Sequence, residues 1–458
     1  MRPIRPLIKA TRHARPHYYH NYSTRTPNSA NMSPITLNPL PSLQPHTPSQ
    51  PPDHWINSPP TSFRNPWPSH DNSRKGPLSL FQVRFGRDRN FVPIPETRDE
   101  LVKVRTPDWG RGTEGWEDEL KATWIGHAGF LVELPIPASN TSSSSSTTTT
   151  INSEKGEGVP KRGIRILFDA VFAERFSPVS FAGPKRFTPL PCTIEELPEV
   201  DVVCISHNHY DHLDIETIRY IHQTRGDRVH FFAPLGNKEW FVQTSGLGIP
   251  ETRVTDMDWW EGVEVDVDLD DSRTKGKVRL TCCPAQHGSG RGIRDHGNTL
   301  WCSWAVEALS VADIAAAANT TTTTTTSSID GPAANKKLFF AGDTAYRAFT
   351  SPSPCPAFVE IGTKLGPFDL ALLPIGCFNP REFMANVHAS PQDSLEIHKD
   401  IRSKKSIGMH YGVIRGGLSS QYEDVREPVR QWKRACEEEG RWDTGECGVC
   451  DVGETVGV

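Results

Sequence analysis

The stretch Cys204-Ile205-Ser206-His207-Asn208-His209-Tyr210-Asp211-His212-Leu213-Asp214 follows directly on an apolar run that starts at Val202. It places three histidines and two carboxylates within residues 207–214. Side chains of an extended chain alternate between two faces, so His207 and His209 can converge on one metal ion at the end of a strand. The spacing therefore predicts a metal site where a strand passes into a loop.

The residues after this histidine pair indicate a second metal position. The pattern from Asp214 to Gln223 predicts a helix, so Asp211 and His212 lie in the turn before it and point away from the first position. Imidazole and carboxylate ligands without thiolate are typical of catalytic Zn, Fe or Mn sites. We therefore expect two neighbouring metal ions; the alternative is a polar loop that contains histidines by chance.

Composition excludes several classes of protein. A length of 458 residues allows one large domain or two ordinary ones. A net charge of -5 and a pI of about 6.4 give no overall attraction to nucleic acid or anionic lipid. Ten scattered cysteines favour a reducing compartment over a disulfide scaffold. Cys447 and Cys450 form a single CxxC motif, which without a second one is weak evidence of a site and favours plain packing. No apolar run approaches the ~18 residues of a membrane span.

The N-terminal part differs in composition from the rest. Residues 1–52 contain no Asp or Glu, and six Arg or Lys residues lie within the first 25. This composition is similar to that of a mitochondrial presequence, and Pro39 to Pro52 reads as a linker. We assign residues 1–60 to a basic, Pro/Ser-rich leader, either a targeting peptide or a disordered tail, and residues 61–458 to a folded domain.

The predicted domain alternates strands and helices, which indicates a layered α/β architecture. Two Ser/Thr-rich stretches, 139–161 and 312–335, are predicted to be disordered insertions. Strands are expected at 122–133, 164–169, 202–205, 229–233, 262–267, 278–283, 300–306, 337–342, 370–375 and 406–409. Helices are expected at 215–224, 236–244 and 391–402.

Three further polar residues each follow a predicted strand: His287, Asp343 and His410. A single histidine is more often a core or surface residue than a ligand. The recurrence of one pattern at three strand ends favours a shared site, because the ends of strands can meet at one edge of a sheet.

Together, His-x-His-x-Asp-His and these downstream residues resemble the metallo-β-lactamase superfamily, whose fold is an αββα sandwich with two metals at one sheet edge. The resemblance implies that His207, His209 and His287 hold one Zn²⁺ ion. It further implies that Asp211, His212 and His410 hold a second, with Asp343 bridging both.

The flanking sequence is similar to that of the N-acylphosphatidylethanolamine-hydrolysing phospholipase D family, over roughly residues 101–438 apart from the insertions. The similar segments are Thr123–Ala128, Gly183–Phe187, Pro191–Ile194, Ser206–Asp214, Asp258–Trp260, Gly342–Thr344, Gly366–Leu370, Pro374–Gly376, Pro380–Met384, His388 and His410. The chain departs from the family at Ala170, Gly288 and Tyr411, where proline, tryptophan and tryptophan are usual. No departure removes a ligand, but Gly288 leaves the shape of the substrate groove open.

The resemblance implies hydrolysis of N-acylphosphatidylethanolamine to N-acylethanolamine and phosphatidic acid. Two metal ions lower the pKa of a bridging water and neutralise a phosphodiester. The alternatives are a hydrolase of the same fold that acts on another ester, a lactone or a thioester, and a non-catalytic metal scaffold, against which the complete ligand set argues. RNA is disfavoured, and no nucleic-acid partner is expected, because the chain lacks a basic stripe.

We expect catalytic roles for Asp211, Asp343 and His388. His388 either contacts the substrate phosphate or is a surface histidine, and Tyr210 either faces the substrate or packs. Asp169 and His127 are expected to orient metal ligands from behind.

Residues 171–187 interleave aromatic and basic side chains and are expected to dock at a lipid surface and receive an acyl chain. The alternative is that these aromatics close the core. The residues concerned are Phe172, Phe176, Lys185 and Arg186. We accordingly expect a phospholipid substrate and peripheral association with the mitochondrial inner membrane, or else with a cytosolic membrane surface. The oligomeric state stays open, with a homodimer as one possibility.

Overall fold

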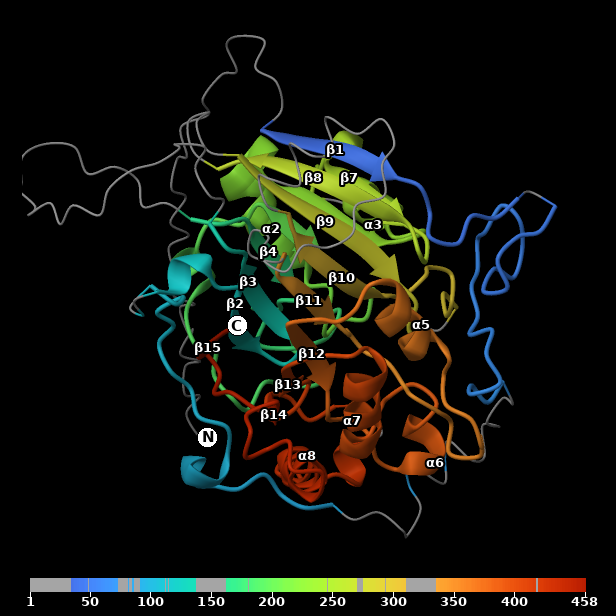
Figure 1. Cartoon of the computed structure of the whole chain (residues 1–458). Coiled ribbons are helices and arrows are strands. Elements are labelled where there is room, and N and C mark those ends of the chain that lie inside the picture. Colours follow the sequence, from blue (N-terminus) through green and yellow to red (C-terminus); the bar gives the residue numbers. More distant parts are fainter. Residues whose placement is uncertain are drawn as a thin grey trace, which may run out of the picture. The chain divides into compact units, whose positions relative to one another are not determined.

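The described strands form two mixed β-sheets that pack face to face (Figure 1). The computed structural model describes residues 34–136, 162–309 and 335–458, apart from residues 48, 73–80, 82–84, 86–90, 112, 114, 180, 245, 270–274, 293 and 417–418. Residues 34–458 cluster into one unit. The predicted insertions lie outside the described residues except for Asn335, and so does the first part of the predicted leader, residues 1–33.

The seven-stranded sheet contains β5, the strand that leads directly into the histidine-rich stretch. Its order is β15-β2-β3-β4-β5-β6-β7; the pairs from β15 to β4 are antiparallel and those from β4 to β7 are parallel. The strands are β2 (Lys121–Gly126), β3 (Gly129–Glu133), β4 (Arg165–Phe168), β5 (Val202–Cys204), β6 (His230–Pro234), β7 (Val254–Met257) and β15 (Thr455–Gly457).

The eight-stranded sheet supplies the other predicted ligands. Its order is β1-β8-β9-β10-β11-β12-β13-β14; the pairs from β1 to β11 are antiparallel and those from β11 to β14 are parallel. The strands are β1 (Ile35–Leu40), β8 (Gly262–Asp268), β9 (Lys275–Cys283), β10 (Ser303–Ala308), β11 (Lys337–Phe340), β12 (Leu370–Pro374), β13 (Ser406–Met409) and β14 (Cys447–Gly448).

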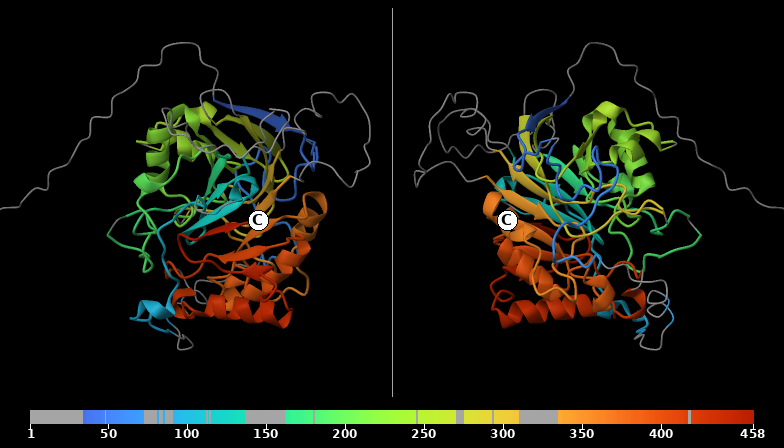
Figure 2. Two further views of the ribbon diagram at one scale, coloured as in Figure 1. Left: turned by 60° about the vertical axis from the view of Figure 1, so that its left-hand side comes forward. Right: turned by 90° about the vertical axis from the view of Figure 1, so that its right-hand side faces the viewer.

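Helices cover the two outer faces, as the views in Figure 2 show. The green helices α2 (Ile215–Arg225) and α3 (Lys238–Gln243) lie on the side of the seven-stranded sheet, where Ile218, Ile221 and Phe241 join its outer core cluster. The orange and red helices lie on the other side: α5 (Ala357–Lys364), α6 (Arg381–Met384), α7 (Pro391–Asp400) and α8 (Glu427–Glu438). Short 3₁₀ turns occur at 98–100, 116–118, 194–196, 226–228, 251–253 and 419–421. None of the helices in the described ranges has the length and apolar character to cross a bilayer.

Period-two alternation explains the layers. In β3, Phe130 and Val132 belong to the core between the sheets, whereas Leu131 belongs to the core under α2 and α3. In β5, Val202 and Cys204 face the first core and Val203 faces the second. A strand buried on both faces reads as a continuous apolar run, which is why the sequence predicted it readily. The predicted αββα sandwich is confirmed.

The structure differs from the sequence prediction at two places. Residues 122–133 form a hairpin of β2 and β3 and not one strand, because Gly126 and His127 adopt left-handed φ angles of 109° and 56° and reverse the chain. The predicted boundary between the leader and the folded domain, at residue 60, lies too far along the chain. β1 pairs with β8 along the edge of the eight-stranded sheet, so residues from Pro34 onward belong to the folded unit.

Candidate metal centre

Three histidines from two loops form the first ligand group. His207 and His209 follow β5, and His287 follows β9. His207 Nε2 lies 2.8 Å and His287 Nε2 lies 3.4 Å from His209 Nδ1. The ring nitrogens of all three lie within 4.8 Å of one another. The convergence matches the grouping expected from the sequence.

Hydrogen bonds at Nδ1 of His207 and His287 determine which ring nitrogen of each faces the centre of the group. His287 Nδ1 lies 2.7 Å from the carbonyl of Val387, which can only accept, so Nδ1 carries the hydrogen. Ser206 Oγ donates its single hydrogen to Asp169 at 2.5 Å, so the 2.9 Å contact with His207 Nδ1 requires Nδ1 to donate. His207 and His287 thus both present an Nε2 lone pair to the centre of the group.

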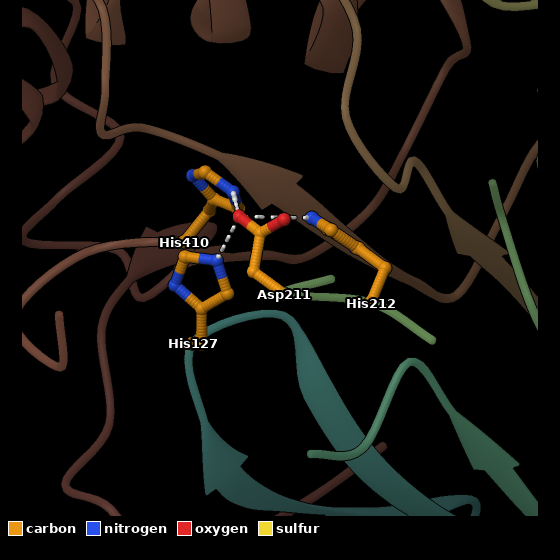
Figure 3. A group of neighbouring side chains, drawn as sticks. All are labelled: His127, Asp211, His212 and His410. Atoms are coloured by element: carbon orange, nitrogen blue, oxygen red, sulfur yellow. Dashed lines mark hydrogen bonds and ion pairs between the residues drawn. The ribbon is translucent and has the colours of Figure 1, made fainter. Parts of the chain in front are cut away.

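The second group surrounds Asp211 (Figure 3). Its Oδ2 atom lies 3.1 Å from His127 Nε2, 3.8 Å from His212 Nε2 and 3.9 Å from His410 Nε2. His212 comes from the loop before α2, His410 follows β13, and His127 is the turn residue of the β2–β3 hairpin. The structure therefore adds His127 to the three residues expected here.

Asp343 lies between the two groups. Its Oδ2 is 3.8 Å from His287 Nε2 and 3.2 Å from His212 Nε2, and its Oδ1 is 3.0 Å from His410 Nε2. The preceding Gly342 has φ +58°, and a Cβ there would meet the Ser206 Cβ at 2.5 Å. Glycine is thus required for Asp343 to lie against the loop after β5.

Asp169 fixes this loop from behind. It follows β4 with a left-handed φ of 38°, and its carboxylate accepts hydrogen bonds from the Ser206 backbone N–H at 2.8 Å and from the Ser206 hydroxyl. It also accepts a bond from His212 Nδ1 at 2.7 Å, which leaves His212 Nε2 directed at Asp343. This is the arrangement by which a carboxylate fixes the tautomer and orientation of a ligating histidine.

Burial and neighbouring charges shift the pKa values strongly. Burial, followed by the neighbouring imidazole of His287, lowers the pKa of His209 to about 3. Burial alone raises the pKa of Asp343, but the imidazoles of His212, His410 and His388 outweigh it and hold that pKa well below its usual value. Burial lowers the pKa of His212, but the carboxylates of Asp343, Asp211 and Asp169 outweigh it and raise that pKa well above its usual value. These shifts favour a neutral His209 and an ionised Asp343, the forms in which such side chains bind metal.

Several buried polar atoms of this centre form no well-directed hydrogen bond among the described residues, although some lie close to an atom of opposite charge. They are His127 Nδ1, His212 Nε2, Asp343 Oδ1, His388 Nδ1, and both ring nitrogens of His410. Such atoms cost free energy unless they are satisfied. The donor set of imidazole and carboxylate fits a divalent cation of the Zn, Fe or Mn class.

A cavity of about 360 Å³ opens beside the centre. His209, Asp211 and His410 lie in its wall, together with the predicted substrate contacts Tyr210, Phe176 and His388. His388 Nδ1 lies 3.9 Å from Asp343 Oδ2, so His388 is buried at the centre and is not a surface histidine.

The other predicted substrate contacts lie elsewhere. Phe172 packs against the core under α2, and exposed Lys185 forms an ion pair with Glu174 at 2.7 Å. Arg186 donates to the Val171 carbonyl at 2.6 Å. None of these three is among the described residues that line the cavity. The pattern of basic and aromatic residues in the sequence identified the segment 171–187. It did not show which of the side chains line the cavity.

The cavity also contains residues to which the sequence analysis assigned no role in the site. Met384, Tyr411, Arg415 and Glu423 line it. Glu423 is half-buried and accepts hydrogen bonds from the backbone N–H groups of 377, 378 and 379 at 3.0, 2.8 and 3.3 Å. No local pattern marks these residues, because Met384 ends α6 and the other three come from the connection between β13 and α8, which only the fold brings together.

Comparison with known proteins places this centre among metal-dependent hydrolases. The family model described as "Beta-lactamase superfamily domain" matches residues 164–315 and 309–411. The chain is 33% identical over 383 residues to N-acyl-phosphatidylethanolamine-hydrolyzing phospholipase D 1 of Caenorhabditis elegans, covering 83% of this chain and 86% of that protein. It is 28% identical over 355 residues to a Saccharomyces cerevisiae protein named "N-acyl-phosphatidylethanolamine-hydrolyzing phospholipase D, mitochondrial". The match covers 76% of this chain and 66% of that protein.

Solved structures give more distant matches. The isothiocyanate hydrolase from Delia radicum gut bacteria has 16% sequence identity and a TM-score of 0.43, with 73% of this chain and 98% of that chain covered.

Proposed function

Because the chain belongs to the N-acylphosphatidylethanolamine-hydrolysing phospholipase D family of metallo-β-lactamase-fold proteins, we propose that it hydrolyses N-acylphosphatidylethanolamine to N-acylethanolamine and phosphatidic acid. It is a metal-dependent hydrolase. One observation carries the proposal furthest: two convergent ligand groups lie on either side of Asp343, beside a cavity whose wall contains His209, Asp211 and His388.

We propose two Zn²⁺ ions as the cofactor. His207, His209 and His287 would hold one, and Asp211, His212 and His410 the other, with Asp343 contacting both. When bound, the ions supply an activated water and neutralise the charge of a phosphodiester. His127, through its 3.1 Å contact with Asp211, fixes the direction of that carboxylate.

The chain's own residues have distinct tasks in this scheme. Asp343 holds negative charge between the two groups, since its pKa is well below the usual value. His388 lies beside Asp343 in the cavity wall, and burial, the first cause, lowers its pKa well below the usual value. We propose that neutral His388 contacts a phosphate oxygen of the substrate through a ring N–H. Tyr210 and Phe176 form the wall along which the lipid lies.

Access by lipid is proposed through the segment 171–187. Phe176 is buried in the cavity wall, whereas Phe181 is 82% exposed a few residues later. An exposed aromatic followed by Lys185 suits a headgroup boundary, where apolar and cationic groups both find partners. We propose peripheral association with a membrane of the mitochondrion, for which the name of the yeast relative is the support. A homodimer stays a prediction.

Product analysis tests the proposal. Purified protein loaded with Zn²⁺ is incubated with N-acylphosphatidylethanolamine in mixed micelles, and products are identified by mass spectrometry. We expect N-acylethanolamine and phosphatidic acid in equal amounts, lost in Asp343→Asn and retained in the matched Asp268→Asn, which changes a carboxylate on β8 paired with Lys275. Intact lipid after incubation with fully metallated protein would overturn the substrate, and ester, lactone and thioester substrates would then be compared.

A further inference from the structure

A segment near the N-terminus, residues 62–71, crosses the loops that supply three of the proposed site residues; we call it the N-terminal strap. The backbone N–H of Phe63 donates to Gly297 O at 2.7 Å, and Ser69 O accepts from the Ala348 N–H at 2.7 Å. Gly297 lies in the loop after His287, and Ala348 lies in the loop after Asp343. The strap thus contacts both loops.

Within the strap, Asn65 contacts a proposed metal ligand directly. Its side-chain Nδ2 donates to the backbone carbonyl of His287 at 2.8 Å, and the residue is only 4% exposed. The ring of His287 is fixed separately, by the 2.7 Å bond from Nδ1 to Val387 O. His287 is therefore held at its backbone by the strap and at its ring by the loop after α6.

Gln286, the residue before His287, connects the strap to the loop of Asp343. Ser69 Oγ donates to Gln286 Oε1 at 2.6 Å, and Gln286 Nε2 donates to Ser69 O at 3.3 Å. The backbone N–H of Gln286 donates to Thr344 Oγ1 at 2.9 Å. Buried Gln286 thus joins the strap, through its side-chain amide, to the strand end that carries Asp343, through its backbone N–H.

The end of the strap contacts the loop of His388. The backbone N–H of Asp71 donates to Asn386 Oδ1 at 2.7 Å, and Asn386 Nδ2 donates back to Asp71 O at 3.0 Å. Asn386 lies next to Val387, whose carbonyl holds the His287 ring. The strap therefore contacts Gln286, the neighbour of His287, and Asn386, the neighbour of the residue whose carbonyl holds the His287 ring.

We propose that the N-terminal strap positions His287 for metal binding, with Asn65 and Ser69 as its positioning residues. Outer groups that orient a ligand contribute about 10 to 100-fold in metal affinity. The inference deepens the proposed function, since it rests on His287 as a ligand. It makes metal affinity in one half of the centre depend on a segment more than two hundred residues away in sequence.

A simple stabilising role of the strap predicts a different outcome. Residues N-terminal to the strap already attach this part of the chain, because His54 Nε2 and Trp55 Nε1 contact Asp258 at 2.7 and 2.9 Å. Loss of a purely stabilising contact lowers the melting temperature of the metal-free protein and leaves metal affinity unchanged at temperatures where the protein is folded. Loss of a positioning contact changes the affinity itself.

The test compares Asn65→Asp with Asn57→Asp. The first replaces an N–H donor to the His287 carbonyl by an oxygen; the second makes the same change at an exposed residue whose Oδ1 accepts from the Thr61 N–H at 2.9 Å. Zn²⁺ affinity is measured on full-length protein by competition with a chromophoric chelator, well below the melting temperature. We expect one of two Zn²⁺ steps to weaken about 10 to 100-fold in Asn65→Asp, with both steps unchanged in Asn57→Asp.

Ser69→Ala provides a second variant in case Asn65→Asp does not fold, because it removes only the hydroxyl bond to Gln286. It should weaken the same Zn²⁺ step and leave the other unchanged. Two unchanged Zn²⁺ steps in the folded variants would overturn the inference. Chelator competition needs no lipid, so a weakened step without lipid hydrolysis would sustain the inference while the proposed substrate fails.

Discussion

The strands β2 to β5 carry buried charge at both of their ends, and the two ends are built in opposite ways. At one end, Lys121 Nζ and Arg165 Nε lie 2.8 and 2.6 Å from the two carboxylate oxygens of Glu133. At the other end lie His127, Asp169 and the loop of His207. We call these the paired end and the histidine end.

At the paired end, charges of opposite sign satisfy each other. Asp201 adds a bidentate pair with Arg162, at 2.5 and 2.8 Å, and accepts the Arg165 backbone N–H. At the histidine end, buried carboxylates face several imidazoles, and some of the ring nitrogens form no hydrogen bond among the described residues. Buried charge that is internally paired serves the fold, whereas buried charge that leaves convergent lone pairs requires a ligand from outside.

The largest expected effect of a single change is at the histidine end. Asp343→Asn removes the negative charge between the two ligand groups while keeping the size of the side chain. Metal-based charge stabilisation supplies several kcal/mol, so turnover should fall by roughly 10³-fold or more. Initial rates of lipid hydrolysis and metal content by mass spectrometry check this. A variant that keeps both Zn²⁺ ions and wild-type turnover would contradict the difference between the ends.

Removal of the metal should destabilise the wild-type protein through the histidine end alone. A ligand present at a thousand times its dissociation constant stabilises the folded state by about 4 kcal/mol. A chelator should therefore lower the melting temperature of wild type, which differential scanning calorimetry measures. The paired-end variant Glu133→Gln should show the same chelator-induced shift, whereas Asp343→Asn should show a much smaller one. Equal shifts in all three proteins would mean that the chelator acts elsewhere.

Glu133→Gln should reduce stability without reducing turnover of the folded protein. Breaking a buried ion pair by removing one partner costs about 3 kcal/mol, because Lys121 and Arg165 lose their shared counter-ion. Burial raises the pKa of Glu133, but Arg165 and Lys121 outweigh it and lower that pKa below its usual value. This stability is therefore present above the unfolded pKa of about 4.3 and is lost as pH falls through the lower folded pKa. Melting curves at neutral and acid pH should show the difference from wild type shrinking in acid.

The smallest expected effect is that of changing Asp169, which holds the loop at the histidine end. Asp169→Asn weakens the hydrogen bond that orients His212, and such a change costs about 10 to 100-fold in metal affinity. Chelator competition measures it, and Asp201→Asn at the paired end is the matched control. If Asp201→Asn lowered Zn²⁺ affinity as much, the two ends would be coupled and not separate in function.

Sequence alone predicted that the proposed ligands of the histidine end lie together, because these residues obey local rules. His207, His209, Asp211 and His212 lie in one stretch of six residues shortly after a strand, and His287, Asp343 and His410 each follow a recognisable strand. A buried strand is an apolar run, and polar residues directly after it are conspicuous. Asp343 and His410 follow β11 and β13, which lie in the parallel part of the eight-stranded sheet, so both side chains emerge at the same edge.

Other features carried no such signal. The hairpin of β2 and β3 looked like one strand because both of its halves are fully buried, and only Gly126 and Gly129 hint at the turn. Of the six residues of β1, only Ile35 is buried, so the strand lacks an alternating pattern and was assigned to a leader. Tyr411, Arg415 and Glu423 reach the cavity through packing of loops, which no spacing rule describes.

The pairing of β1 with β8 also imposes an order of events during synthesis. Ile35–Leu40 leaves the ribosome early, but its partner Gly262–Asp268 follows more than two hundred residues later. At roughly 5–20 residues per second, the backbone groups of the first strand stay unpaired for about 10 to 45 seconds. During that interval it is an exposed edge that another chain can pair with. Nascent protein should therefore depend on chaperones at this step, and slower translation should increase aggregation of the growing chain.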